Sequence, residues 1–252
     1  MKVSIITDVL NSRGTIEQAI LSVISQNYPD IEYIVVDGAS KDGTLDIINK
    51  YKSKISHLIS EPDKGHFEAM NKGIKIATGD IIGFLHADDF FIDNRVIKKV
   101  ASAFEQNNID CLWSDLVYVD KNNTDRIIRY WKSSSYRKGL FKKGWMPPHP
   151  AFFVKKWVYE KHGYFNNYLG VAGDYELMLR FLHKYEITGY YIPEVLVKMR
   201  LGGLSNKSLK HIIQKTSQDL QAWKLNDLKG ALAAVFLKNV SKILQFFLRE
   251  NN

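Results

Sequence analysis

Apolar positions in the first 120 residues alternate between two kinds of pattern. Four short runs rich in β-branched residues predict strands: "VSIIT" (Val3 to Thr7), "IEYIVVD" (Ile31 to Asp37), "SHLIS" (Ser56 to Ser60) and "DIIGFLHA" (Asp80 to Ala87). Between them, apolar residues recur at helical spacing: Ile16, Ala19, Ile20, Val23, Ile24; Leu45, Ile47, Ile48, Tyr51; Phe67, Met70, Ile74, Ala77. The alternation predicts an α/β fold, Rossmann-like, in which helices flank a mainly parallel sheet.

Acidic residues follow these predicted strands at their carboxyl ends. Asp8, Asp37 and the adjacent pair Asp88 and Asp89 all fall there, where open parallel sheets bind their ligands. Neither G-x-G-x-x-G nor G-x-x-x-x-G-K-[ST] occurs, which argues against a dinucleotide oxidoreductase and a P-loop enzyme. A phosphate ligand would then need another source of positive charge. Mg²⁺ or Mn²⁺ held by Asp88 and Asp89 would supply it.

These acids also have structural alternatives. Asp88 or Asp89 could cap the helix predicted to begin near Asn94, but Asp93 is better placed for that cap. We therefore favour metal or phosphate chemistry for the pair. Asp37 could reach a ribose or a base, or it could belong to a turn.

The sequence resembles the family 2 glycosyltransferases, which are inverting enzymes of the GT-A fold. The segments that carry the resemblance are "SIITDVLN", "SVISQNYPDIEYIVVDGASKDGT", "SEPDKGHFEAMNKGIKIATGDIIGFLHADD" and "AGDYELMLR". It runs from Lys2 to about Asp120 and resumes from His149 to Ser205. We expect a GT-A domain over 1–205, divided into a nucleotide-sugar half (1–120) and an acceptor half (121–205), followed by a C-terminal helical extension (206–252).

The resemblance implies a nucleotide-diphosphate sugar, expected to be a UDP-sugar, across the strand ends. The residues expected to contact it are Thr7, Asp8, Asn11, Asp37, Lys64, Asn71, Asp88 and His149. Asp88 and Asp89 match the metal-binding acidic motif, with Mn²⁺ or Mg²⁺ as the cofactor, and Asp174 matches the catalytic base. The chain departs from the family at His86, where an acid is common, at Leu10, where an aromatic is common, and at Gly173, where Glu is frequent.

Several of these residues have simpler interpretations. Asp174 opens a predicted helix, "DYELMLRFLHK", where an acid is favoured by the helix dipole alone. Lys64 could be a solvated turn residue, and Asn71 an exposed helix residue. His149 lies between prolines that fix its loop and could contact the diphosphate or metal site, or could be an ordinary hydrogen-bonded loop residue.

Composition indicates the compartment. The single Cys111 cannot form an internal disulfide, which is typical of a reducing compartment. The start of the chain is too short in apolar residues for a signal peptide, and no run of about 18 apolar residues indicates a membrane span. We expect a cytoplasmic protein.

Positive charge is concentrated in one region. Of the net charge of +8, the segment from Arg126 to His162 holds ten Lys or Arg and one acid, Glu160. Such a patch attracts nucleic acid, anionic membrane or phosphorylated ligands. The acids at the strand ends argue against nucleic acid. From Leu228 an apolar helical repeat extends to Phe247, which suits a helix at the inner face of a membrane, packing against the domain, or a homo-oligomer contact.

The expected activity is transfer of a sugar, with inversion, from a nucleotide-diphosphate sugar to a hydroxyl of a glycan or lipid-linked acceptor in surface polysaccharide or glycan biosynthesis. A sugar nucleotidyltransferase is the first alternative, but "DVLNSRGT" is a poor match to its glycine- and arginine-rich phosphate loop. A non-catalytic carbohydrate-binding module is the second, and it would leave the acids unexplained.

Overall fold

A computed structural model describes residues 1–202 and 209–244 of the chain. The strands are β1 (Val3–Val9), β2 (Ile31–Asp37), β3 (His57–Ser60), β4 (Ile81–Phe84), β5 (Phe90–Phe91), β6 (Cys111–Val119), β7 (Ile127–Trp131), β8 (Phe152–Lys155) and β9 (Gly189–Arg200). The helices are α1 (Ile16–Ile24), α2 (Thr44–Lys50), α3 (His66–Ile76), α4 (Val96–Gln106), α5 (Lys156–His162), α6 (Gly173–Met178), α7 (Leu209–Leu225) and α8 (Ala231–Leu244).

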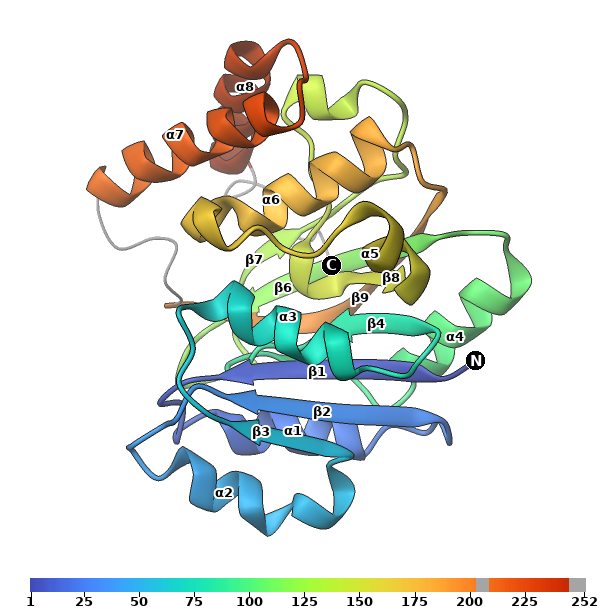
Figure 1. Ribbon diagram of the computed structural model, residues 1–252, viewed down its shortest axis with the longest axis vertical. Coiled ribbons are helices and arrows are strands. Elements are labelled where there is room, and N and C mark those ends of the chain that lie inside the picture. Colours follow the sequence, from blue (N-terminus) through green and yellow to red (C-terminus); the bar gives the residue numbers. More distant parts are fainter. Residues whose placement is uncertain (203–208, 245–252) are drawn as a thin grey trace.

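The N-terminal half of the sheet confirms the alternating pattern. Its strands lie in the order β3-β2-β1-β4, and all three pairings are parallel. The bounds of β2 agree with the prediction, whereas β4 ends at Phe84 rather than Ala87 because the chain turns at residues 87–88. The carboxyl ends of the four strands therefore lie along one edge (Figure 1).

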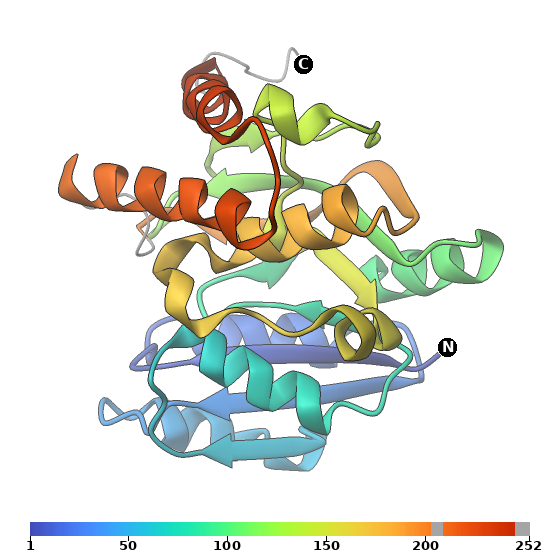
Figure 2. The ribbon, with the colours of Figure 1, turned by 45° about the horizontal axis from the view of Figure 1, so that its top comes forward.

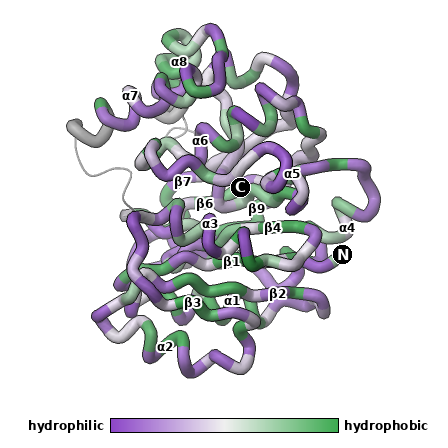
Figure 3. The backbone as a smooth tube through the Cα atoms, in the orientation of Figure 1, coloured by the Kyte–Doolittle hydropathy of each residue, from purple (hydrophilic) through white to green (hydrophobic). Residues whose placement is uncertain are grey.

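Alternate residues of the strands face two different helical layers. On β2, Tyr33 and Val35 pack with α1 and α2, while Ile34 and Val36 pack with α3. Figure 1 shows α3 in front of the parallel strands and α1 behind them, and Figure 3 shows these strands as a hydrophobic centre between more polar helices. The predicted α/β architecture with flanking helices is confirmed.

The C-terminal half of the sheet was not predicted. Strand β8 pairs antiparallel with both β4 and β6, and it thereby joins the parallel strands to the rest of the sheet. Strand β9 runs parallel to β6, and β5 and β7 pair antiparallel with β9 and β6. Because β8 is antiparallel to both of its neighbours, β6 and β9 run in the same direction as β4, and their carboxyl ends point to the same edge of the sheet.

Helices α7 and α8 lie over the side of the molecule farthest from β3 (Figure 2). α8 packs against the short 3-10 segment Leu140–Lys143. The backbone approaches closely there, since a Cβ on Gly144 would lie 2.2 Å from the backbone nitrogen of Lys238. The expected boundary at residues 205/206 and the expected end of the apolar helix at Phe247 lie outside the described residues.

A buried lysine joins α8 to α7. Lys238 forms an ion pair of 2.7 Å with Asp219 of α7. Its Nζ also lies 3.4 Å from the centre of the Tyr175 ring. Val235 is buried as well, so one face of α8 packs against the domain.

Candidate active site

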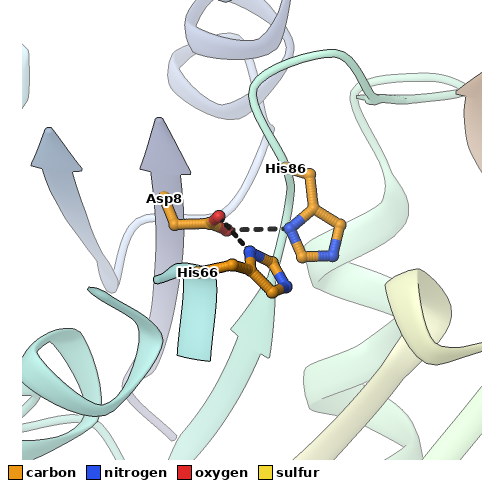
Figure 4. Close-up of side chains that lie close together, drawn as sticks. All are labelled: Asp8, His66 and His86. Atoms are coloured by element: carbon orange, nitrogen blue, oxygen red, sulfur yellow. Dashed lines mark hydrogen bonds and ion pairs between the residues drawn. The ribbon is translucent and has the colours of Figure 1, made fainter. Parts of the chain in front are cut away.

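Three ionisable side chains from distant segments meet where β1 and β4 end. Asp8 lies near the end of β1, His86 follows its parallel neighbour β4, and His66 is the first residue of α3. Asp8 Oδ2 lies 2.5 Å from His66 Nδ1, and Asp8 Oδ1 lies 2.8 Å from His86 Nδ1. Figure 4 shows both rings turned toward the one carboxylate. We call these three residues the strand-end triad.

Electrostatics within the triad are dominated by mutual attraction. Burial alone would raise the pKa of Asp8, but the two imidazoles hold it well below its usual range. Burial alone would lower the pKa of His86, yet the carboxylate of Asp8 raises it to about 10. His86 is therefore an imidazolium at neutral pH, and it donates a hydrogen bond to an ionised Asp8.

The adjacent acids Asp88 and Asp89 follow directly. Asp89 is fully buried, and neither of its carboxylate oxygens has a hydrogen-bond partner within the described residues. Burial and the neighbouring Asp88 raise the pKa of Asp89 well above its usual range, which His86 and Arg200 offset only in part. Arg200 donates to the backbone carbonyl of Asp88 at 2.6 Å and so fixes the turn.

Neither acid caps a helix. α4 begins at Val96 with Arg95 at its N-cap and no side-chain capping hydrogen bond, so the cap expected at Asp93 was wrong as well; Asp93 accepts a hydrogen bond from the Arg95 N–H at 2.7 Å in the preceding turn. The capping alternative for Asp88 and Asp89 is therefore excluded.

Asp174 lies near His86 and His149, and the three side chains line one pocket. Asp174 occupies the first turn of α6, as predicted, and its Oδ2 lies 3.6 Å from His149 Nε2. The His149 and His86 rings are 5.5 Å apart. Burial lowers the pKa of His149 to about 4 against the opposing effect of Asp174, so the ring is neutral. The structure thus brings Asp8, His86, His149 and Asp174 into one site.

A cleft of about 110 Å³ opens beside Asp174 and His149. Its wall carries four basic side chains, which are Arg129, Arg200, Lys215 and Lys238. Aromatic rings complete it: Tyr118 and Trp131 stack 6.4 Å apart, with the Arg129 guanidinium 4.7 Å from the Tyr118 ring centre. These features suit an anionic ligand with an apolar or sugar portion.

The ends of β1 and β2 hold a second group of predicted residues. Asp37 is buried and accepts hydrogen bonds from Ser60 Oγ at 2.7 Å and from the Ser40 N–H. Asn11 has a positive φ of 49°, and its side chain accepts from the Lys41 N–H at 2.9 Å. Lys64 is exposed just before α3. These residues shape the loops at this edge, and their contact with a ligand stays a prediction.

Two predicted contacts lie elsewhere. The fully buried Thr7 accepts a hydrogen bond from the Tyr33 hydroxyl at 3.1 Å, so its side chain faces the layer of α1 rather than the site. Asn71 is bound at both ends of its amide, donating to the Phe165 carbonyl at 2.9 Å and accepting from the Phe165 N–H at 3.0 Å. The Asn71 amide is therefore neither exposed nor available to a sugar, because it is hydrogen-bonded to the segment that precedes α6.

Sequence reasoning missed His66 and Arg200. His86 falls within a predicted strand end next to the acid pair, and His66 directly precedes the predicted helix that starts at Phe67, so the position of His66 beside a strand end was a usable signal. Arg200 ends the unpredicted strand β9, so nothing local indicated that it would reach Asp88.

Comparison with known proteins identifies the family. The sequence profile of "Glycosyl transferase family 2" matches residues 4–163. The chain belongs to this family. It is 30% identical over 207 residues to a "PGL/p-HBAD biosynthesis glycosyltransferase" of Mycobacterium bovis, covering 81% of this chain and 78% of that one. A second relative is an uncharacterized glycosyltransferase of Mycobacterium tuberculosis, 33% identical over 184 residues, 71% of this chain and 68% of the relative.

Solved structures confirm the GT-A type of fold for this family 2 glycosyltransferase. S. aureus TarS 1–349 in complex with UDP aligns with a TM-score of 0.67 at 19% identity, over all of this chain and 74% of that one. The chain spans 41% of the longer TarS structure. The mannosyltransferase PcManGT from Pyrobaculum calidifontis, in complex with GDP-Man and Mn²⁺, aligns with a TM-score of 0.66 at 18% identity, over 94% and 69% of the two chains.

Proposed function

We propose that this glycosyltransferase moves a sugar, with inversion, from a nucleotide-diphosphate sugar to an acceptor hydroxyl, with Asp174 as the general base. The observation that carries the proposal is the place of Asp174: it borders both the strand-end residues and the basic cleft, 3.6 Å from the neutral His149. A donor on one side and an acceptor on the other would meet at this carboxylate. The UDP, UDP-GlcNAc and GDP-Man held by the neighbouring structures support a nucleotide-sugar donor.

The base would act on the acceptor. An acceptor hydroxyl within hydrogen-bond reach of Asp174 would give up its proton as it attacks the anomeric carbon, and such assistance commonly contributes about 10²- to 10⁴-fold in rate. Attack from the face opposite the leaving nucleoside diphosphate inverts the configuration. His149, neutral and beside the carboxylate, would orient it.

A divalent cation, Mn²⁺ or Mg²⁺, fits the acid pair. Asp89 has two buried carboxylate oxygens without a hydrogen-bond donor in the described part of the chain, and Asp88 stands next to it. Such oxygens are costly to bury unless a cation compensates them. When bound, the cation would neutralise charge that develops on the leaving diphosphate. The Mn²⁺ in the PcManGT structure supports this use of metal.

The basic cleft suits an acceptor that carries phosphate. Arg129, Arg200 and Lys215 supply its positive charge from β7, β9 and α7, while Lys238 of α8 is paired with Asp219. We propose a glycan acceptor linked to lipid through phosphate or diphosphate. The relative assigned to PGL/p-HBAD biosynthesis fits a role in glycan biosynthesis.

Contact with an anionic membrane surface would bring such an acceptor to the site. No helix in the described ranges is long and apolar enough to cross a bilayer. On α8, however, Leu232 (78% exposed) and Phe236 (68% exposed) form an apolar stripe one turn apart. The exposed Lys142 and Lys143 lie in the 3-10 segment that packs against this helix. We propose a cytoplasmic protein held peripherally at the inner face of the membrane by both features.

A matched pair of variants tests the membrane proposal. Leu232→Ser should reduce sedimentation with vesicles that contain anionic lipid, whereas Leu21→Ser, an exposed leucine on α1, should not. High salt should weaken binding further because the lysines contribute through charge. Equal loss in the two variants would contradict the proposal, and a concentration-dependent change in mass with Leu232→Ser would indicate a homo-oligomer instead.

A donor screen tests the activity itself. The full chain is incubated with Mn²⁺ and UDP- or GDP-sugars, and release of the nucleoside diphosphate is measured with and without a phosphate-linked glycan acceptor. We expect one donor to be turned over and the acceptor to accelerate release. Formation of a nucleotide sugar from a sugar phosphate and a nucleoside triphosphate would instead show a nucleotidyltransferase.

A further inference from the structure

The strand-end triad has the composition of a metal site. It offers one carboxylate oxygen and two imidazole nitrogens, and a set of such atoms from Asp8, His66 and His86 lies within 4.8 Å of one another. The three residues come from three separate elements, so their approach is a product of the fold and not of sequence proximity.

The donor atoms lie close to the spacing that one ion requires. Metal–nitrogen and metal–oxygen bonds of about 2.0–2.2 Å place the donor atoms of one ion no more than about 4.4 Å apart, and the donor atoms of the triad lie within 4.8 Å of one another. In the ion-free protein each Nδ1 is hydrogen-bonded to a different oxygen of the Asp8 carboxylate, at 2.5 Å and 2.8 Å, and Figure 4 shows both rings turned toward it. A bound ion would replace these hydrogen bonds and displace the proton that His86 donates to Asp8.

The donor set also indicates which ions would bind. Mg²⁺ and Ca²⁺ prefer oxygen ligands, whereas two imidazoles with one carboxylate suit Mn²⁺, Co²⁺ or Zn²⁺ and leave coordination positions open for water or phosphate oxygens. The acid pair Asp88 and Asp89 offers only oxygens. The two groups at this edge therefore differ in the ions they favour.

We propose that Asp8, His66 and His86 form a binding site for a borderline divalent transition ion, separate in its ligands from the acid pair. The site would lie next to His149, whose ring centre is 5.5 Å from that of His86. The ion's use in sugar transfer rests on the proposed function. Its binding does not, because the ligands are complete without a nucleotide.

The test measures Co²⁺ binding to the full chain without nucleotide. Metal is removed with a chelator, and the visible absorption of Co²⁺ is followed in the presence of millimolar Mg²⁺. All samples carry Asp88→Asn, which weakens metal binding by the acid pair, and this variant is the background against which the other substitutions are compared. We expect one Co²⁺ per chain in this background and at least a tenfold loss of affinity when His66→Gln is added. His57→Gln, a histidine on β3 outside the triad, is the matched control and should bind as the background does.

Absence of Co²⁺ binding in the background, or equal binding with His66→Gln, would overturn the proposal and leave the triad a closed hydrogen-bonded network. A second measurement guards against a variant that does not fold. In Asp88→Asn protein labelled with ¹⁵N-histidine, substoichiometric Mn²⁺ should broaden the ring signals of His66 and His86 more strongly than those of His162 or His183. Uniform broadening would contradict the site. If either test fails, only the triad site is rejected. The proposed glycosyltransferase activity is tested separately by the donor screen.

Discussion

The strand-end triad and the acid pair lie at the same edge of one sheet, yet their charges are balanced in opposite ways. Asp8 has two imidazoles against its two oxygens, and its pKa is well below the usual range. Asp89, a few residues beyond the next strand, has no hydrogen-bond partner for either oxygen within the described residues, and burial raises its pKa, which His86 and Arg200 offset only in part. The protein thus gives the Asp8 carboxylate two direct partners and leaves that of Asp89 with partial compensation.

This difference shows how one sheet edge can combine a stable framework with a reactive position. A carboxylate paired with protein groups stabilises the folded state, while a buried carboxylate without partners costs stability until a ligand compensates it. A bound cation is therefore expected to stabilise the acid pair more than the strand-end triad, whose carboxylate already has two partners.

The largest expected effect is at Asp174, a third carboxylate, whose proposed role is in catalysis and not in charge balance at the sheet edge. Asp174→Asn keeps the shape of the side chain but removes the proton acceptor, so transfer should fall by about 10²-fold or more while donor affinity persists. Steady-state rates and nucleotide titrations on the same preparation would measure both. Full activity in the variant would exclude Asp174 as the base.

His86→Gln removes one of the two hydrogen-bond partners of the Asp8 carboxylate. Removing one partner of a buried ion pair should lower the free energy of unfolding by about 3 kcal/mol near pH 6. Because the pKa of His86 is raised to about 10, its stabilising effect is complete below about pH 6.5 and is lost as the pH rises toward 10. Urea unfolding at pH 6 and pH 10 would test this, and an equal difference between wild type and variant at both values would contradict it.

Asp89→Asn tests the cost of burying the Asp89 carboxylate in the ion-free protein. Since the pKa of Asp89 is raised on folding, the wild-type group destabilises the ion-free protein progressively as the pH rises above about 4. The variant should therefore be as stable as wild type or up to about 1 kcal/mol more stable at pH 7. Thermal unfolding in chelator would show this. A clear loss of stability would mean that Asp89 has a partner in the ion-free protein.

The smallest effect is expected at Thr7, which faces away from both groups. Thr7→Val removes the acceptor of the Tyr33 hydroxyl and should cost about 1 kcal/mol of stability. Nucleotide affinity should not change, and weakened affinity would return Thr7 to the site.

The sequence predicted the parts of the molecule that depend on local pattern. β1 to β4 and their helices follow from periodicity, and Asp174 was placed on its helix because "DYELMLRFLHK" has a continuous apolar face. Strand β8 was missed because its position between β4 and β6 depends on pairing across some 70 residues of chain. The partnership of Asp8 with His66, separated by 58 residues, and the hydrogen bonds of Asn71 to Phe165 depend on tertiary packing in the same way.

The most direct test of the account is calorimetric titration of the full chain with UDP and GDP, with and without Mn²⁺, in wild type and in Asp89→Asn. We predict that one nucleoside diphosphate binds wild type more tightly when Mn²⁺ is present, and that Asp89→Asn loses this metal-dependent increase while remaining folded. Metal-dependent binding of equal strength in the variant would contradict the assignment of the acid pair.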